Sequence, residues 1–185
     1  MALSPNQPLR IGFAAILLAI KARLNVVTSI PLTAVKLIGR SNTTVPNLTA
    51  ERDVLVRASG FTIGPEEFVA GRIVTQLIRT VYVFPRVRMM RDQTDRDEVW
   101  LTDPAGIFAL EEGIANGLHE WFPMDGDKNQ LTTVGLKLVK GEGADKDIPA
   151  GKQVGNVWAG WGHSSLAFNA HYLPPIDPGA TGILN

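Results

Sequence analysis

The strongest constraint on the fold is an apolar stripe that lies between two prolines. Its members recur at spacings of 3, 4, 4 and 3 residues, which places them on one face of an α-helix; they are Ile107, Leu110, Ile114, Leu118 and Trp121. Asp103 and Pro104 precede the stripe, and these residue types are favoured at the N-cap and at the first helical position. Pro123 follows it. We therefore predict a helix over 104–122, with one face that other elements must cover.

Two glycines interrupt this predicted helix. Gly113 and Gly117 each cost about 1 kcal/mol relative to alanine in a helix interior. One interpretation is that they mark places where another backbone comes close.

An apolar run near the start of the chain predicts a second helix. The run covers 11–20 and is bounded by Arg10 and Lys21. Crossing a bilayer takes about 20 apolar residues, so the run is too short to span, and Lys21 occupies the zone where a secretory signal would be cleaved. We interpret 9–24 as a helix of the folded domain. Its apolar face is broad, so we expect it to be covered on more than one side.

Alternating apolar residues predict the strands. The clearest alternation lies in the second half of the segment from Gly71 to Met90, with Val83 and Val87 on one side and Arg86 and Arg88 on the other. Pro85 predicts that this strand is at an edge or carries a bulge, because proline cannot donate to a ladder. Gly64-Pro65-Glu66-Glu67 predicts a turn or a short helical start. Further strands are expected over 53–59, 134–139 and 166–172.

The order of helix, strands, helix and strands favours the α+β class. We expect a mostly antiparallel sheet packed against two helices in one domain with long loops. The expected organisation is a flexible arm over 1–9, the domain over 10–173 and an extended tail rich in proline and glycine over 174–185.

Composition removes several function classes. The chain has 185 residues, and 18 Lys and Arg balance 18 Asp and Glu. Zero net charge argues against general binding to nucleic-acid phosphates, which requires clustered positive charge. Cysteine is absent, which excludes disulfides, thiolate metal sites and a cysteine nucleophile.

The remaining residues indicate no reaction chemistry. His119, His163 and His171 lack the spacing of a metal site, and the acidic segment 92–98 lacks the order of a calcium loop. The frame of a nucleophile elbow is missing around 162–165. We expect no enzymatic activity, no cofactor and no metal.

Basic and aromatic side chains supply the candidate interface. Four arginines lie on the strand predicted between Gly71 and Met90 or just beyond it, and they could bind a partner's carboxylates or phosphates; they are Arg79, Arg86, Arg88 and Arg91. They could equally be plain exposed strand positions. Trp158 and Trp161 lie in a segment interpreted as a loop. They could anchor a partner or occupy ordinary core or hairpin positions. We predict that Arg86→Glu with Arg88→Glu leaves the subunit folded but prevents its assembly.

The element order resembles the tail terminator proteins of tailed bacteriophages. The segments that carry the resemblance span most of 9–173, and they are Ile16–Leu24, Arg79–Val87, the acidic loop, the helix over 104–122 and Leu166–Tyr172. The chain departs from the compact pattern over 32–51, over 60–75 and in its tail.

The resemblance implies a subunit of the virion, assembled in the host cytoplasm. Such subunits form a ring, usually of six copies, on the head-proximal end of the tail tube, where the ring stops tube growth and meets the head connector or stopper. The expected partners are therefore further copies, the tube protein and the connector, with no membrane and no sequence-specific nucleic acid. The alternatives are another neck or head-completion protein, or a small ligand-binding module or accessory enzyme that uses the β-sheet and the Trp158 to His163 loop as a pocket. A third alternative is binding of nucleic acid through the strand that carries the arginines.

Overall fold

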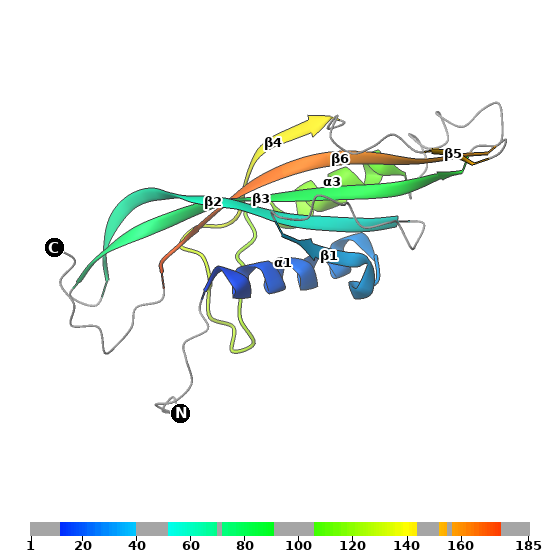
Figure 1. Cartoon of the computed structure of the whole chain (residues 1–185). Helices are drawn as coiled ribbons and strands as arrows, with labels where there is room; N and C mark the ends of the chain where they lie inside the picture. The colour runs from blue at the N-terminus through cyan, green and yellow to red at the C-terminus, as the bar shows by residue number, and fades with distance from the viewer. Residues whose placement is uncertain are drawn as a thin grey trace.

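A computed structural model describes residues 12–39, 52–69, 72–90, 106–143, 152–154 and 157–174. They form two layers, a six-stranded sheet with two helices on one of its faces (Figure 1). In chain order the elements are α1 (Phe13–Thr28), a 3-10 turn η1 (Leu32–Ala34), β1 (Val35–Ile38), β2 (Arg52–Val69), β3 (Arg72–Met90), α3 (Ile107–Leu118), β4 (Lys137–Gly143), β5 (Lys152–Val154) and β6 (Val157–Tyr172). The predicted α+β class is confirmed.

The sheet has the strand order β1-β2-β3-β6-β4, with β5 paired to β6 off this path. Only the β1–β2 pair is parallel among these described strands. The order places β3 in the interior of the sheet, so the prediction of an edge strand at Pro85 is wrong. The alternative of a bulge at Pro85 is not found either: the pairing of β3 with β6 lapses at Phe84 and Pro85 and resumes at Arg86 without a change of register.

The predicted turn at Gly64-Pro65-Glu66-Glu67 is also wrong. These residues lie inside β2, which continues to Val69 and forms a long antiparallel hairpin with β3. Two register shifts, between Ala58 and Phe61 and between Ile63 and Glu66, absorb extra residues of β2. Such shifts bend and twist a strand without ending it, which is how this segment stays extended.

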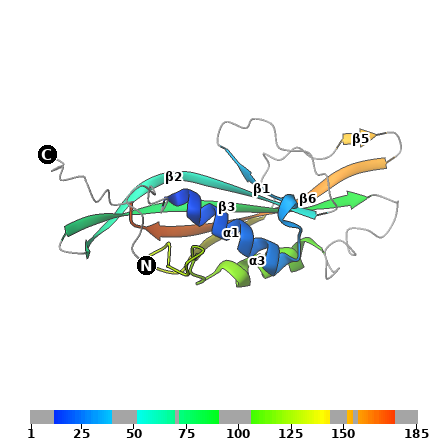
Figure 2. The same ribbon diagram turned by 90° about the horizontal axis from the view of Figure 1, so that it is seen from below.

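Helix α1 begins and ends later than the sequence predicts. It runs through Thr28 and stops at Ser29, whose φ of 55° is left-handed, shortly before Pro31. Its buried row consists of Ile16, Ile20, Leu24 and Thr28. Seen from below the sheet, α1 lies beside α3 under the middle strands (Figure 2).

Helix α3 is shorter than the predicted helix over 104–122. It ends at Leu118, and Trp121 packs against the core from the segment that follows. The proposed cap residues Asp103 and Pro104 lie outside the described residues. The apolar stripe is otherwise confirmed, because the buried residues of α3 are Ile107, Leu110, Ile114 and Leu118.

Gly117 marks a close approach of another helix, but the atoms nearest to it belong to a side chain and not, as the sequence suggests, to a backbone. A Cβ on Gly117 would lie 2.6 Å from Val27 Cγ1 of α1, so the two helices touch there. A Cβ on Gly113 would lie 3.7 Å from the carbonyl oxygen of Val27, which is an ordinary contact.

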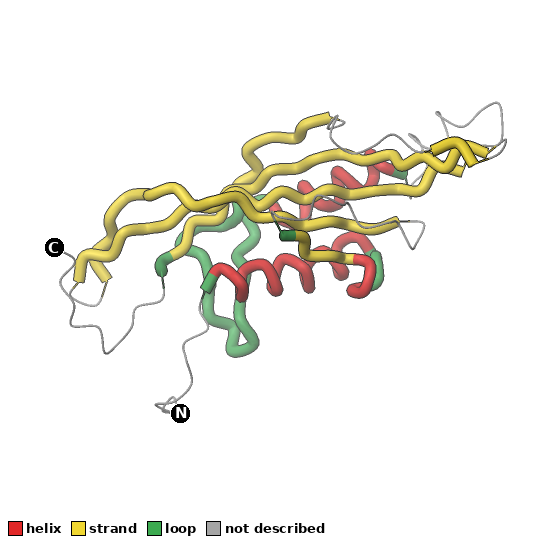
Figure 3. The backbone as a smooth tube through the Cα atoms, in the orientation of Figure 1, coloured by secondary structure: helices red, strands yellow, loops and turns green. Residues whose placement is uncertain are grey.

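The core fills the space between the helices and one face of the sheet. The strands contribute alternate residues to it, which are Val35, Val54, Val56, Val81, Val83, Val87, Leu166, Phe168, Ala170 and Tyr172. Strand β6 is longer than the predicted strand over 166–172, because it starts at Val157. In Figure 3 the C-terminal end of β2 and the N-terminal end of β3, which pair with each other, extend beyond the helices.

Candidate interaction surfaces

Arg86 lies in the interior and forms an ion pair with Asp53. The two residues are opposite each other on β3 and β2, and their side chains are 0% and 1% exposed. Arg86 Nε donates to Asp53 Oδ1 at 2.6 Å, and Arg86 Nη2 donates to Asp53 Oδ2. This is the two-point geometry that a guanidinium and a carboxylate prefer. Lys36 Nζ lies 3.9 Å from Asp53 Oδ2.

This burial corrects the role assigned to Arg86. A side chain that water cannot reach and that is bonded to Asp53 is not available to grip another subunit. The expectation that Arg86→Glu leaves the subunit folded is wrong for the same reason, because it would place two carboxylates together in the interior. Alternation along the strand put Arg86 on the correct face, away from the helices, but gave no sign that this face is buried at Asp53.

Arg79 is held by contacts within its own chain. Its Nε donates to Tyr172 Oη at 2.9 Å, and its guanidinium carbon lies 4.8 Å from the Phe13 ring centre and 5.5 Å from that of Phe61. Cation–π contacts of this kind hold side chains in place. Arg79 therefore joins the first turn of α1 to β2, β3 and β6, and this position is half-buried.

Strand pairing gives the positions of three of the other proposed interface residues, Arg88, Trp158 and Trp161. Arg88 lies opposite Trp161 in the pairing of β3 with β6, and Trp158 lies opposite Gln153 of β5. Both tryptophans belong to β6, so their assignment to a loop is wrong, whereas the alternative of a hairpin position is confirmed for Trp158, which lies in the hairpin that β5 and β6 form. Arg91 lies outside the described residues. The structure thus brings Arg88 and Trp161 together in register, whereas Arg79 lies nine residues away along β3.

An exposed apolar surface lies elsewhere, on the free end of the β2–β3 hairpin. We call residues 61–69 and 72–79 the β-arm. Four of its large apolar side chains are more than half exposed, with Phe68 at 77%; they are Phe61, Ile63, Phe68 and Ile73. Sequence reasoning missed this surface because the supposed turn at Gly64 divided it into unrelated pieces.

These four side chains share one face of the β-arm. Phe61 pairs with Arg79, Ile63 with Leu77 and Phe68 with Ile73, and directly opposed residues of an antiparallel pair point to the same side. On β3, Ile73 and Leu77 continue the alternation to Val81 and Val83, which pack under the helices. The exposed face of the β-arm is therefore an extension of the core face, beyond the reach of the helices (Figures 1 and 2).

A second uncovered apolar surface follows the outer side of α1. Every residue of the row Ala14, Leu18, Ala22 and Val26 is exposed. We call this row the α1 outer row. The expectation that α1 is covered on more than one side is thus not met within the described part of a single chain.

The far face of the sheet carries a polar network at the base of the β-arm. His171 Nδ1 lies 3.0 Å from Gln76 Oε1, and Gln76 Nε2 donates to Glu67 Oε1 at 2.9 Å and to Thr133 Oγ1. Burial, followed by the charge of Lys137, lowers the pKa of His171 below its ordinary value. Within the described ranges, no three His, Asp or Glu side chains gather as a metal site would require.

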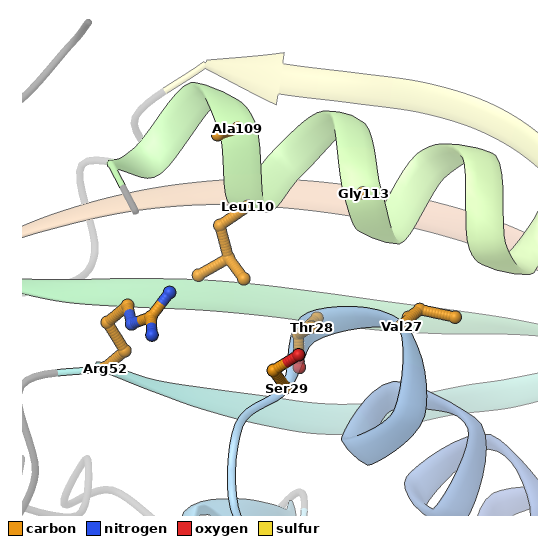
Figure 4. A pocket seen from close by; sticks show the side chains of 7 residues that line it. All are labelled: Val27, Thr28, Ser29, Arg52, Ala109, Leu110 and Gly113. Carbon is orange, nitrogen blue, oxygen red and sulfur yellow. The ribbon is translucent and has the colours of Figure 1, made fainter. Parts of the chain in front are cut away.

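A small pocket opens between the end of α1 and the start of α3. Figure 4 shows Arg52, Thr28 and Ser29 at its rim, with Leu110 pointing in from α3. Its volume is about 130 Å³. Pockets for small molecules usually measure about 300–1,000 Å³, so it suits a few water molecules better than an organic ligand.

Comparison of the sequence with protein-family models and with curated proteins gave no match. The resemblance to tail terminators therefore stays a prediction. Among the helices described here, none is both long and apolar enough to cross a membrane.

Proposed function

We propose that the protein is a structural subunit of a bacteriophage tail, a tail terminator. In this role several copies form a ring on the head-proximal end of the tail tube. One face of the ring binds the last ring of tube protein, and the other presents a new surface to the head connector. The protein acts by binding and catalyses no reaction.

The observation that carries this proposal is the β-arm. Soluble proteins that work alone rarely leave a contiguous strip of large apolar side chains in water, because its burial is favourable. Here Phe61, Ile63, Phe68 and Ile73 form such a strip on a hairpin that extends past the helices. A strip on a projecting element is suited to contact with another protein.

Other features are consistent with an assembly subunit. The zero net charge does not favour a phosphate-backbone partner. The pocket of about 130 Å³ beside Arg52 is small for an organic ligand, and its described lining residues do not include 158–163, the segment that the alternative ligand-binding module would use. The α1 outer row supplies a second surface, and a ring subunit needs two, one for each neighbour.

Electron microscopy with tail tubes from the same source tests the proposal. The protein is purified and imaged alone and after mixing with growing tubes. We expect rings at one end of each tube and an arrest of tube growth. If the protein does not bind the tube ends and the tubes grow at the same rate as untreated tubes, the terminator function is refuted.

A matched pair of variants sharpens this test. Phe68→Glu changes the exposed face of the β-arm, and Thr62→Glu changes an exposed position on the opposite face of the same strand. We expect Thr62→Glu to cap tubes as the natural protein does. Phe68→Glu should remain folded, because its side chain is 77% exposed, but should no longer assemble.

A further inference from the structure

We propose that the β-arm of one subunit docks along the α1 outer row of a second copy of this chain. This inference rests on the proposed function for its setting, a closed ring, but it concerns one contact that can be measured separately. It assigns a partner to each of the two uncovered apolar surfaces.

The apolar face of the β-arm lacks the helix layer that covers the same face of the sheet in the core. Under the helices, Val81 and Val83 of β3 are buried by the helix layer. The same face of the same strand continues through Leu77 to Ile73, where neither of the two described helices lies over it (Figure 2). A helix from a neighbour would extend the two-layer packing along the strand.

Helix α1 has the surface to provide that cover. A helix on the surface of a globular protein normally presents polar residues to water. The α1 outer row contains none, and its Leu18 is 61% exposed. Helix α3 is different, since its exposed side includes Glu112 and Asn116 beside Phe108. Of the two described helices, α1 is therefore the better occupant.

The two surfaces agree in length. From Ala14 to Val26 the row spans 12 residues, or about 18 Å at the rise of an α-helix. From Ile73 to Arg79, which pairs with Phe61, the arm spans six residues, or about 20 Å at the rise of a strand. Each surface can cover the other along its whole length.

Charge also favours this pairing. Glu66 is the acidic residue on the apolar face of the β-arm, opposite Thr75, and it is exposed. Lys21 of α1 flanks the outer row, three residues after Leu18. A docked arm would bring a carboxylate and an ammonium group to the rim of an apolar contact, where charged pairs help to select the partner.

The contact cannot form within one chain. The β-arm extends away from α1 beyond its first turn, and the outer row is the side of α1 that its own sheet does not cover (Figures 1 and 2). Two different surfaces that meet between copies make a head-to-tail interface, which closes into a ring when the rotation between subunits allows it.

Mixing variants tests the head-to-tail character. Phe68→Glu removes the arm surface and keeps the row, whereas Leu18→Glu removes the row and keeps the arm. Each variant alone should stay monomeric, with its dissociation constant raised at least about 30-fold, as for a central interface residue. Their mixture retains one intact contact and should form a one-to-one dimer that grows no further. A mixture that contains only monomers, or a Leu18→Glu variant that still forms rings, would overturn the inference.

Cross-linking locates the contact directly. The chain has no cysteine, so engineered thiols are the only ones present. Ile63 and Leu18 lie near the middle of their surfaces, so Ile63→Cys and Leu18→Cys should be close whichever way the arm runs. We expect a disulfide dimer from their mixture under mild oxidation, with or without tubes. Thr62→Cys, on the opposite face of the arm, should give much less when paired with Leu18→Cys.

The outcomes separate this inference from the proposed function. Rings on tubes without the Ile63–Leu18 cross-link would overturn the contact and leave the terminator function intact. The cross-link in a protein that does not cap tubes would support the contact and refute the function. Arm variants that form rings but do not bind tubes would assign the arm to the tube protein, and this too would overturn the inference.

Discussion

The buried pair of Asp53 and Arg86 gives the most direct test of the structure. Replacing Arg86 with leucine leaves the Asp53 carboxylate in the interior, where it is 1% exposed. Breaking a buried ion pair by removing one partner costs about 3–5 kcal/mol. Lys36 Nζ remains 3.9 Å from the carboxylate, so we expect the lower end of this range, about 3 kcal/mol.

The reverse substitution and the double variant complete a thermodynamic cycle. Asp53→Leu leaves a guanidinium buried beside β2 and should lose about as much stability as Arg86→Leu. The double variant has no buried charge at this position, and replacement of a whole buried pair by apolar residues is often nearly neutral. We therefore expect it to be more stable than either single variant, with a coupling free energy of about 2 kcal/mol or more.

Urea denaturation at pH 7, followed by circular dichroism, measures these differences. It is done on a background that carries Phe68→Glu, so that assembly does not add to the apparent stability. Raising the salt concentration should change the coupling little, because buried pairs are poorly screened. Surface ion pairs contribute less than about 1 kcal/mol to stability. If both single variants lower the free energy of unfolding by less than this, the buried position of Arg86 is refuted.

Further predictions concern helix contact, pH and the loop after α3. Gly117→Ala should lower the free energy of unfolding by about 1–3 kcal/mol, because its Cβ would clash with Val27, whereas Gly113→Ala should be neutral or stabilising by up to about 1 kcal/mol; urea denaturation of both variants checks this. The pKa of His171 is lowered on folding, so the unfolded chain binds its proton more readily. The contribution of neutral His171 to the free energy of unfolding should be fully present above about pH 6.5 and should be lost as the pH falls below it. His171→Gln should therefore make the melting temperature less dependent on pH between about pH 5 and 7.5. Gly135→Ala should lower the melting temperature, since a Cβ there would lie 2.5 Å from a backbone oxygen.

The sequence predicts the helix layer well because its signal is local. The spacing of Ile107, Leu110, Ile114 and Leu118 depends only on the helical repeat, and these residues are the buried row of α3. The order of elements then leads to the α+β class. The helix ends are less well predicted, since the last residues of α1 and α3 depend on contacts between the two helices and on the chain that leaves them.

The β-arm could not be predicted because Gly64 and Pro65 are strong turn signals by themselves. In the structure the pairing with β3 outweighs them, and the extra residues become register shifts. Arg86 was misassigned for a related reason. Its burial depends on Asp53 being directly opposite, and that register follows from a hairpin that continues to Val69, whereas the sequence predicts a turn at Gly64.

The base of the β-arm is the part that would decide whether the proposed contact closes into a ring. A head-to-tail contact repeats with a fixed rotation, and a small error in that rotation turns a ring into an open helix. The angle of the arm is fixed on both faces of the sheet. On the helix side, the guanidinium of Arg79 lies over the rings of Phe13 and Phe61. On the far side, Gln76 Nε2 donates hydrogen bonds to Glu67 and Thr133. A hairpin held in this way presents its apolar face in one direction, so closure would be set by the fold of each subunit before any two subunits meet.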